Sequence, residues 1–340
     1  MNKQKFLAFF VIAFLFILSA CSSDENVDEA ASGEEGAEGG NTGDLTVGTL
    51  ADVVSLDLHG SNDSASSQVR TNIYERLLNQ DVNMELQPGL ATEFEQVDET
   101  TWNFKLREGT TFHGGEDFTA EDVVATFDRV RDEALASPVL FLYEMIDEIE
   151  VVNDYEINIH TTIPFAPLAS HLAHSTAGIM PKELIDSDYQ AALDAAGNDM
   201  SLEEYYEARD SGSDAYEEIK DDLGEHLGTV IGSEPNGTNH MQFVSRSAGD
   251  SVTLERFDDF QGGDRYFETV EFRVIPETGS RIAELETGGI QIATDIDSSN
   301  VDRVENGSDT ALEIKDSVRM SYLGFNTEKE PFNDPKVRQA

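Results

Sequence analysis

The chain has 340 residues, of which 68 are acidic and 22 basic, so its formal net charge at pH 7 is −46. This excess of acids, with no basic block, argues against nucleic acid as a partner and against electrostatic binding to anionic lipid. Hydrophobic residues make up 39% of the chain, enough to form buried cores. We interpret the charge as an adaptation of the surface to a saline or alkaline medium; attraction of a cationic solute is the alternative.

The first segment of the chain, residues 1–20, predicts a signal peptide. A basic start precedes an uncharged apolar run over 6–18, which is too short to remain in a bilayer as a spanning helix. Cys21 follows two small residues and is the only cysteine of the chain. The junction LSAC resembles the lipobox of bacterial lipoproteins, which implies cleavage before Cys21 and attachment of lipid to its thiol. An ordinary secretory signal with an incidental cysteine is the alternative.

Residues 21–43 predict an acidic flexible linker, because Ser, Gly, Ala, Asp and Glu dominate the segment and cannot bury a core. Beyond the linker, patterns typical of strands and helices alternate irregularly, which favours an α/β or α+β class. Apolar alternation and β-branched runs predict strands at 45–50, 102–107, 252–255 and 270–275, and a hairpin formed by 149–152 and 155–159.

Helices are predicted from apolar spacing and from capping residues. Apolar residues on one face predict a helix over 68–78, and Thr119 followed by acids predicts the start of another. Segment 186–225 is strongly acidic, yet apolar residues recur in it at helical spacing, so we expect amphipathic helices there. Asp334 and Pro335 predict a further helix start, with Pro at the first helical position.

A series of short motifs follows the linker in order along the chain. They are SLDLH at 55–59, IYERL at 73–77, PGLATEF at 88–94, FKLREG at 104–109, FHGG at 112–115, FTAEDV at 118–123, LERF at 254–257, YLGFNT at 322–327 and PFNDPKVRQA at 331–340. Each motif alone is weak evidence. Together they resemble the family of bacterial solute-binding proteins that bind dipeptides, oligopeptides or nickel for ABC importers.

The resemblance implies an α/β, bilobed, type II periplasmic-binding-protein-like fold whose second lobe is incomplete in this chain. We expect the first lobe over 44–275, with an inserted subdomain at about 59–175, and the truncated start of the second lobe over 276–340. A C-terminally truncated fragment is therefore expected. In the family's peptide binders, the acid that holds the ligand's ammonium group would lie past residue 340.

The resemblance also implies a function. We expect the extracytoplasmic solute-binding component of an ABC transporter, anchored by lipid to the outer face of the cell membrane. It would capture short peptides and deliver them to permease subunits that carry a cytoplasmic ATPase. A non-peptide solute, such as a metal chelate or a glutathione-like compound, is the alternative. No enzyme activity, catalytic residue, cofactor or metal site is expected, since no nucleophile is paired with a base and no ligand set is evident.

Three cleft positions can be carried over from the family, and we expect them to contact the solute. The first is an edge that would pair with the peptide backbone, and the second is an apolar position after Ser-Pro. The third is a turn, in which Asn-His-Met replaces the Gly-Pro-Tyr of the family and offers an imidazole; we expect this turn beside the first segment. The residues are Asn62, Asp63 and Ser64 for the edge, Val139 for the apolar position, and Thr238, Asn239, His240 and Met241 for the turn.

Overall fold

The computed structural model describes residues 43–263, 266–315 and 323–339. The predicted signal peptide, Cys21 and all of the predicted linker except Gly43 lie outside the described residues. None of the described helices is long and apolar enough to span a membrane.

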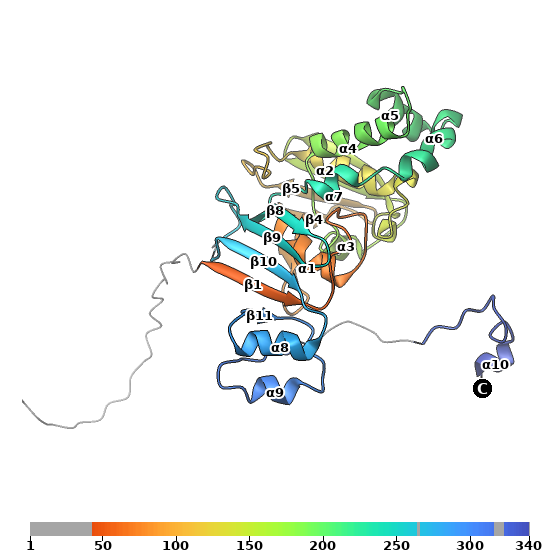
Figure 1. The fold of residues 1–340 in the computed structure, drawn as a ribbon. Helices are drawn as coiled ribbons and strands as arrows, with labels where there is room; N and C mark the ends of the chain where they lie inside the picture. The colour runs from red at the N-terminus through yellow and green to blue at the C-terminus, as the bar shows by residue number, and fades with distance from the viewer. Residues whose placement is uncertain (1–42, 264–265, 316–322, 340) are drawn as a thin grey trace, which may run out of the picture. The chain divides into compact units, whose positions relative to one another are not determined.

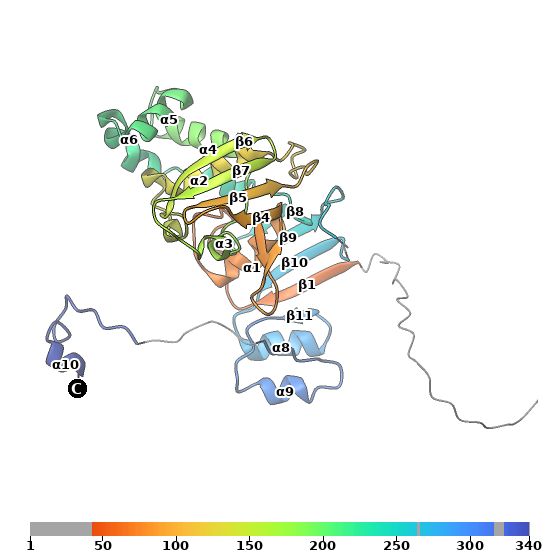
Figure 2. The same cartoon turned by 180° about the vertical axis from the view of Figure 1, so that it is seen from behind.

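Strands form two main sheets (Figures 1 and 2). The five-stranded sheet has the order β11-β1-β10-β9-β8, the four-stranded sheet has the order β4-β5-β7-β6, and β2 pairs with β3. The strands are β1 (Asp44–Thr49), β2 (Leu78–Gln80), β3 (Leu86–Pro88), β4 (Ala91–Gln96), β5 (Thr101–Leu106), β6 (Ile146–Asn153), β7 (Glu156–Thr161), β8 (Met241–Ser247), β9 (Ser251–Arg256), β10 (Thr269–Val274) and β11 (Ile292–Ala293).

Helices connect and cover these strands. They are α1 (Ser64–Ile73), α2 (Ala120–Arg131), α3 (Leu168–His171), α4 (Lys182–Ala195), α5 (Leu202–Ser211), α6 (Asp214–Gly224), α7 (Thr229–Ser233), α8 (Thr278–Glu286), α9 (Val301–Glu305) and α10 (Pro335–Gln339), with short 3-10 turns at Glu133–Leu135 and Leu140–Leu142. The predicted strands, the hairpin β6–β7 and the acidic helices α4 to α6 are confirmed. The helix start after Thr119 is also confirmed, because Thr119 and Asp122 form a capping box.

The helix predicted over 68–78 is misplaced. It begins at Ser64, because the carboxylate of Asp63 caps it by accepting the main-chain N–H of Ser66. It ends at Ile73, since Tyr74 is already extended and donates its hydroxyl to the carbonyl of Leu56. The last predicted residue, Leu78, instead begins β2. Tertiary contacts have overridden the apolar periodicity at this end of the helix.

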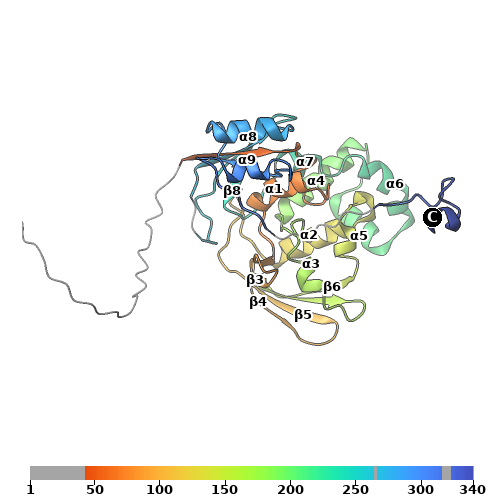
Figure 3. The ribbon, with the colours of Figure 1, turned by 90° about the horizontal axis from the view of Figure 1, so that it is seen from below.

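Apolar side chains from β1, β10 and β11 gather on one face of the five-stranded sheet. β1 runs parallel to both β10 and β11, and the register sets Leu45 beside Val270, and Val47 beside both Phe272 and Ile292. Side chains alternate between the faces of a strand, so these five project from the same face. Figure 3, in which β1 is seen edge-on, shows α1 and α8 on opposite faces of this sheet.

The opposite face of β1 packs closely against the α8 region. A Cβ atom on Gly48 would come within 2.5 Å of the side chain of Ile290 and 3.0 Å of that of Arg281, so a larger residue there would require these side chains to shift. α8 and β11 thus belong with this sheet. We expected the first lobe to end at residue 275, but the five-stranded sheet includes β11, which lies beyond that residue.

A buried ion network ties the chain after β1 to the helices. The guanidinium of Arg129, in α2, lies 2.8 Å from a carboxylate oxygen of Asp57 and 3.2 Å from one of Asp188 in α4. Burial opposes the ionisation of Asp57, but Arg129 holds the pKa of that carboxyl below its ordinary value. Burial and the adjacent Arg129 also lower the pKa of His59 to about 3, so His59 is neutral. This network fixes the SLDLH segment at the base of α1.

Candidate functional site

Helix α1 lies between the two longer segments that the sequence predicts to contact a solute. Asp63 is its N-cap and Ser64 its first residue, whereas the main chain of Asn239 donates to the carbonyl oxygen of Ile73, its last residue, at 3.0 Å. A helix of 10 residues is about 15 Å long. The two segments therefore lie at opposite ends of α1, and the expectation that they lie side by side is wrong. The reason is that the second segment docks on the C-terminal carbonyls of the helix.

The loop before α1 is held by Arg70, whose side chain is fully buried. Its Nη1 donates to the carbonyl oxygen of Asp57 at 2.8 Å, and its Nη2 to that of Ser61 at 3.1 Å. Asp63 is only partly buried, and its carboxylate accepts the hydroxyl of Ser61 at 2.7 Å and the N–H of Ser66 at 2.8 Å. Burial opposes the ionisation of Asp63, but these donors hold the pKa of its carboxyl below the ordinary value. The segment from Asn62 is thus presented by a rigid loop.

The turn before β8 packs directly on the end of α1. A Cβ atom on Gly237 would lie 2.2 Å from the carbonyl oxygen of Ile73, so a side chain cannot be accommodated there. His113 braces the other side of the turn. Its main-chain N–H donates to the carbonyl of Gly237 at 2.9 Å, and its ring Nε2 donates to the carbonyl of Asn239 at 2.8 Å. The edge of its ring also packs on Phe257, with centroids 4.7 Å apart.

Asn239 and His240 form the centre of this turn. The side-chain amide of Asn239 lies 2.7 Å from the carbonyl oxygen of Thr71 in α1. The other atom of that amide lies 2.8 Å from the main-chain nitrogen of His240 and 3.0 Å from its ring Nδ1. Burial lowers the pKa of His240, so the ring is neutral near pH 7.

A cavity of 570 Å³ lies against the apolar face of the five-stranded sheet, between this face and α1. None of its described lining residues has an acidic or basic side chain, apart from the neutral His240. Aromatic and aliphatic side chains dominate the lining, which is typical of ligand pockets. The lining residues are Leu45, Val47, Gln68, Asn72, His240, Met241, Phe260, Gly262, Gly263, Tyr266, Phe267, Val270, Phe272, Ile292 and Thr294.

The structure brings only part of the predicted site to this cavity. Of the turn, His240 and Met241 line it, whereas Thr238 is buried with 1% of its surface exposed. Asn62 and Ser64 are exposed at the far end of α1. Val139 has no exposed surface and packs in the core beneath the four-stranded sheet, so in this structure it is a core residue and not a cleft residue.

The sequence reasoning missed most of the lining. Gln68 and Asn72 are four apart and share one face of α1, so their polar pairing on a predicted helix was a usable signal. No local pattern pointed to Phe260 or Tyr266, which come from the connection between β9 and β10.

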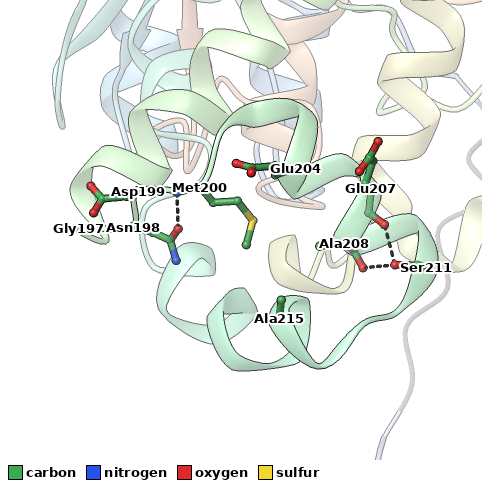
Figure 4. Close-up of a pocket in the computed structure, with 9 residues that line it drawn as sticks. All are labelled: Gly197, Asn198, Asp199, Met200, Glu204, Glu207, Ala208, Ser211 and Ala215. Carbon is green, nitrogen blue, oxygen red and sulfur yellow. Dashed lines mark hydrogen bonds between the residues drawn. The ribbon is translucent and has the colours of Figure 1, made fainter.

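A second cavity, of 710 Å³, is lined by the loop that follows α4, by α5 and by the first turn of α6 (Figure 4). Its hydrogen bonds are local: the N–H of Met200 donates to the side chain of Asn198, and the hydroxyl of Ser211 to the carbonyl of Glu207. Three of its lining residues are acidic, Asp199, Glu204 and Glu207. Among the described residues, no group of three or more His, Cys, Asp and Glu side chains is placed to hold a metal ion.

Comparisons with known proteins bear on this arrangement. Among curated proteins, the chain is 27% identical over 299 residues to the glutathione-binding protein GsiB of Pectobacterium atrosepticum, covering 87% of this chain and 51% of that protein. It is 24% identical over 343 aligned positions to the oligopeptide-binding protein AppA of Bacillus subtilis, covering 99% and 57%. The chain thus spans about half the length of the curated relatives that it matches.

A solved structure supports the same relationship. The structure of Bacillus subtilis AppA in complex with a nonapeptide superposes with a TM-score of 0.66, at 25% identity, over 87% of this chain and 53% of that chain. The expected α/β fold of the periplasmic-binding-protein type is thereby confirmed. The sequence profile described as bacterial extracellular solute-binding proteins, family 5 Middle, matches residues 85–340. The chain belongs to the bacterial extracellular solute-binding proteins of family 5.

Proposed function

We propose that this chain is the solute-capturing part of an extracytoplasmic binding protein of an ABC importer, and that its solute is a short peptide. The observation that carries the proposal is one arrangement: Ser64 and His240 lie near opposite ends of α1, and a largely apolar cavity lies beside this helix. An extended peptide advances roughly 3.3 Å per residue, so about four residues span the ~15 Å between the ends of α1. AppA, a relative with a nonapeptide bound, supports a peptide as the solute.

Binding would follow the chemistry of strand addition. Main-chain hydrogen bonds to an extended peptide supply affinity without demanding particular side chains, and pockets add preference for some of them. The solute would stabilise a closed state by its greater affinity for that state. We propose no chemical step, and the protein would release the solute unchanged to permease subunits that carry a cytoplasmic ATPase.

We further propose that Cys21 carries lipid and tethers the protein to the outer face of the cell membrane. The LSAC junction and the position of the only cysteine support this. Stable anchoring requires more than one acyl chain, so the thiol would carry a diacylglycerol. The acidic segment after Cys21 would keep the folded part clear of the membrane surface.

A second candidate solute is a glutathione-like compound. Its support is the 27% identity to the glutathione-binding protein GsiB. The altered turn, with His240 in place of the family's proline, is compatible with a changed solute. A metal chelate is the third option, with the imidazole as one ligand.

Isothermal titration calorimetry of the full chain tests the proposal. Tripeptides to pentapeptides, reduced glutathione and a nickel–histidine chelate are titrated separately, and we expect heat of binding with the peptides. Ser64→Trp should weaken peptide binding at least tenfold, because the bulky side chain stands where the peptide enters. Ser233→Trp, a change at an exposed residue of α7, is the matched control and should leave the affinity unchanged. Binding of glutathione or the chelate, with no peptide bound, would reject the peptide assignment.

A further inference from the structure

We propose that the solute must present hydrogen-bond donors, and not carboxylate oxygens, to two acceptors in the cavity, Nε2 of His240 and Oε1 of Gln68. Asn239 sets this requirement, because it determines which nitrogen of the His240 ring carries the proton. The inference rests on the proposed function and deepens it by naming the chemical groups that the cavity recognises.

The orientation of the Asn239 amide is determined by two partners independently. The carbonyl oxygen of Thr71 can only accept a hydrogen bond, so the amide atom 2.7 Å from it is the nitrogen. The main-chain N–H of His240 can only donate, so the amide atom 2.8 Å from it is the oxygen. Both partners require the same orientation, and Oδ1 of Asn239 therefore faces His240.

The tautomer of His240 follows from that orientation. Its Nδ1 lies 3.0 Å from Oδ1 of Asn239, which is an acceptor only, so Nδ1 carries the ring proton. The ring is neutral because burial lowers its pKa. Nε2 is then an unprotonated acceptor, and within residues 43–263, 266–315 and 323–339 it makes no hydrogen bond. The ring also lies beside that of Phe260, with centroids 5.8 Å apart.

Gln68 supplies a second acceptor to the same cavity. Its Nε2 lies 3.5 Å from a carboxylate oxygen of the exposed Asp295, which can only accept, and this long contact favours the amide orientation with Nε2 toward Asp295. Its Oε1 is buried and finds no hydrogen-bond partner among the described residues. A buried polar atom left without a partner costs free energy, so a solute that donates to it would recover that loss.

These two acceptors restrict the class of solute. Peptide N–H groups, hydroxyls, an indole N–H or an ammonium can donate to them, whereas a carboxylate would meet lone pairs at both positions. The aliphatic and aromatic lining favours an apolar side chain next to the donor. The cavity therefore suits the main chain and an apolar side chain of a peptide better than the carboxylate groups of glutathione.

The tautomer can be measured in the free protein by long-range ¹H–¹⁵N correlation NMR of the full chain at pH 7. We expect His240 to be the Nδ1–H form, and Asn239→Leu to lose this preference. Asn236→Leu, three positions earlier in the same loop and not in contact with His240, is the control and should keep it. An Nε2–H form in the wild-type protein would overturn the proposal.

The donor requirement is tested with the tripeptides to pentapeptides that bind in calorimetry, each compared with analogues N-methylated at successive amides. At least one methylation should weaken binding about tenfold or more, and the ¹⁵N resonance of His240 Nε2 should shift on binding of the parent peptide. Equal affinity for all analogues, or an unmoved Nε2 resonance, would overturn the donor assignment while leaving peptide binding intact. If the wild-type protein bound no peptide at all, the proposed function itself would fail, and this assignment of the donors with it.

Discussion

The carbonyl oxygen of Asn239 accepts a hydrogen bond from Nε2 of His113 at 2.8 Å, across 126 positions of the sequence. The N–H of Gly237 in turn points to Nδ1 of the same ring at 3.4 Å. A carbonyl only accepts and an N–H only donates, so His113 is the neutral Nε2–H form. The turn that presents His240 is thus held between His113 and the end of α1.

His113 makes the stability of the fold depend on pH. Burial lowers the pKa of His113 to about 4, from 6.5 for the ordinary side chain. Between pH 6.5 and pH 4, His113 is protonated in the unfolded chain but not in the folded protein. The contribution of neutral His113 to the free energy of unfolding is therefore fully present above pH 6.5 and is lost as the pH falls toward 4. His113→Gln keeps a donor for Asn239 without titrating. Urea unfolding at pH 7 and pH 5 should show the wild-type protein losing about 2 kcal/mol more than this variant. Equal losses of unfolding free energy in the wild-type protein and the His113→Gln variant would show that His113 does not titrate as its burial indicates.

A second prediction concerns Asp132, whose buried carboxylate accepts three tyrosine hydroxyls. Tyr189, Tyr205 and Tyr216, from α4, α5 and α6, donate to it at 2.7, 2.6 and 2.7 Å. Burial, together with the adjacent carboxylate, raises the pKa of Tyr205. Asp132→Leu leaves three buried hydroxyls without their acceptor, so we expect a loss of about 3–5 kcal/mol in the free energy of unfolding.

Single tyrosine changes provide the comparison for Asp132. Tyr205→Phe removes one of the donors to the buried carboxylate, and we expect a loss of about 1.5–3 kcal/mol in chemical denaturation. Tyr206→Phe removes a bond to the partly buried Asp186 and should cost less. Equal effects of these two changes would mean that the Asp132 cluster is not a special source of stability.

The third prediction concerns the net charge of −46. If the acidic surface is an adaptation to a saline medium, self-repulsion should destabilise the fold at low salt, where charges interact over longer distances. The Debye length falls from about 10 Å at 0.1 M salt to about 3 Å at 1 M. Thermal midpoints measured across this range should therefore rise with sodium chloride. A flat or falling series would remove this explanation of the charge, while adaptation to an alkaline medium could survive.

The fourth prediction concerns the proposed tether. Cys21→Ala removes the only thiol of the chain. We expect the variant to remain as the precursor or to be released from membranes, because no other side chain can accept the lipid. Fractionation of cells and mass spectrometry of the N-terminus check both outcomes. Correct processing of the variant, with wild-type recovery in the membrane fraction, would refute the lipoprotein proposal.

Local sequence patterns determined much of this protein. The strands β1, β5, β9 and β10, the hairpin β6–β7 and the start of α2 were all predictable, because alternation and capping depend on neighbours in the chain. The ordered motifs also indicated the family. The end of α1 was not predictable, because contacts with distant segments terminate it.

The tertiary structure alone decided the site. His113 in one loop, Thr71 in α1 and Asn239 before β8 are far apart in sequence, and their hydrogen bonds exist only once the turn docks on the helix. Val139 illustrates the opposite outcome: an apolar residue in a recognisable motif can line a cleft or fill a core, and only packing distinguishes the two. The proton position on His240 follows from oriented partners in three dimensions, so no pattern of residues along the chain could have determined it.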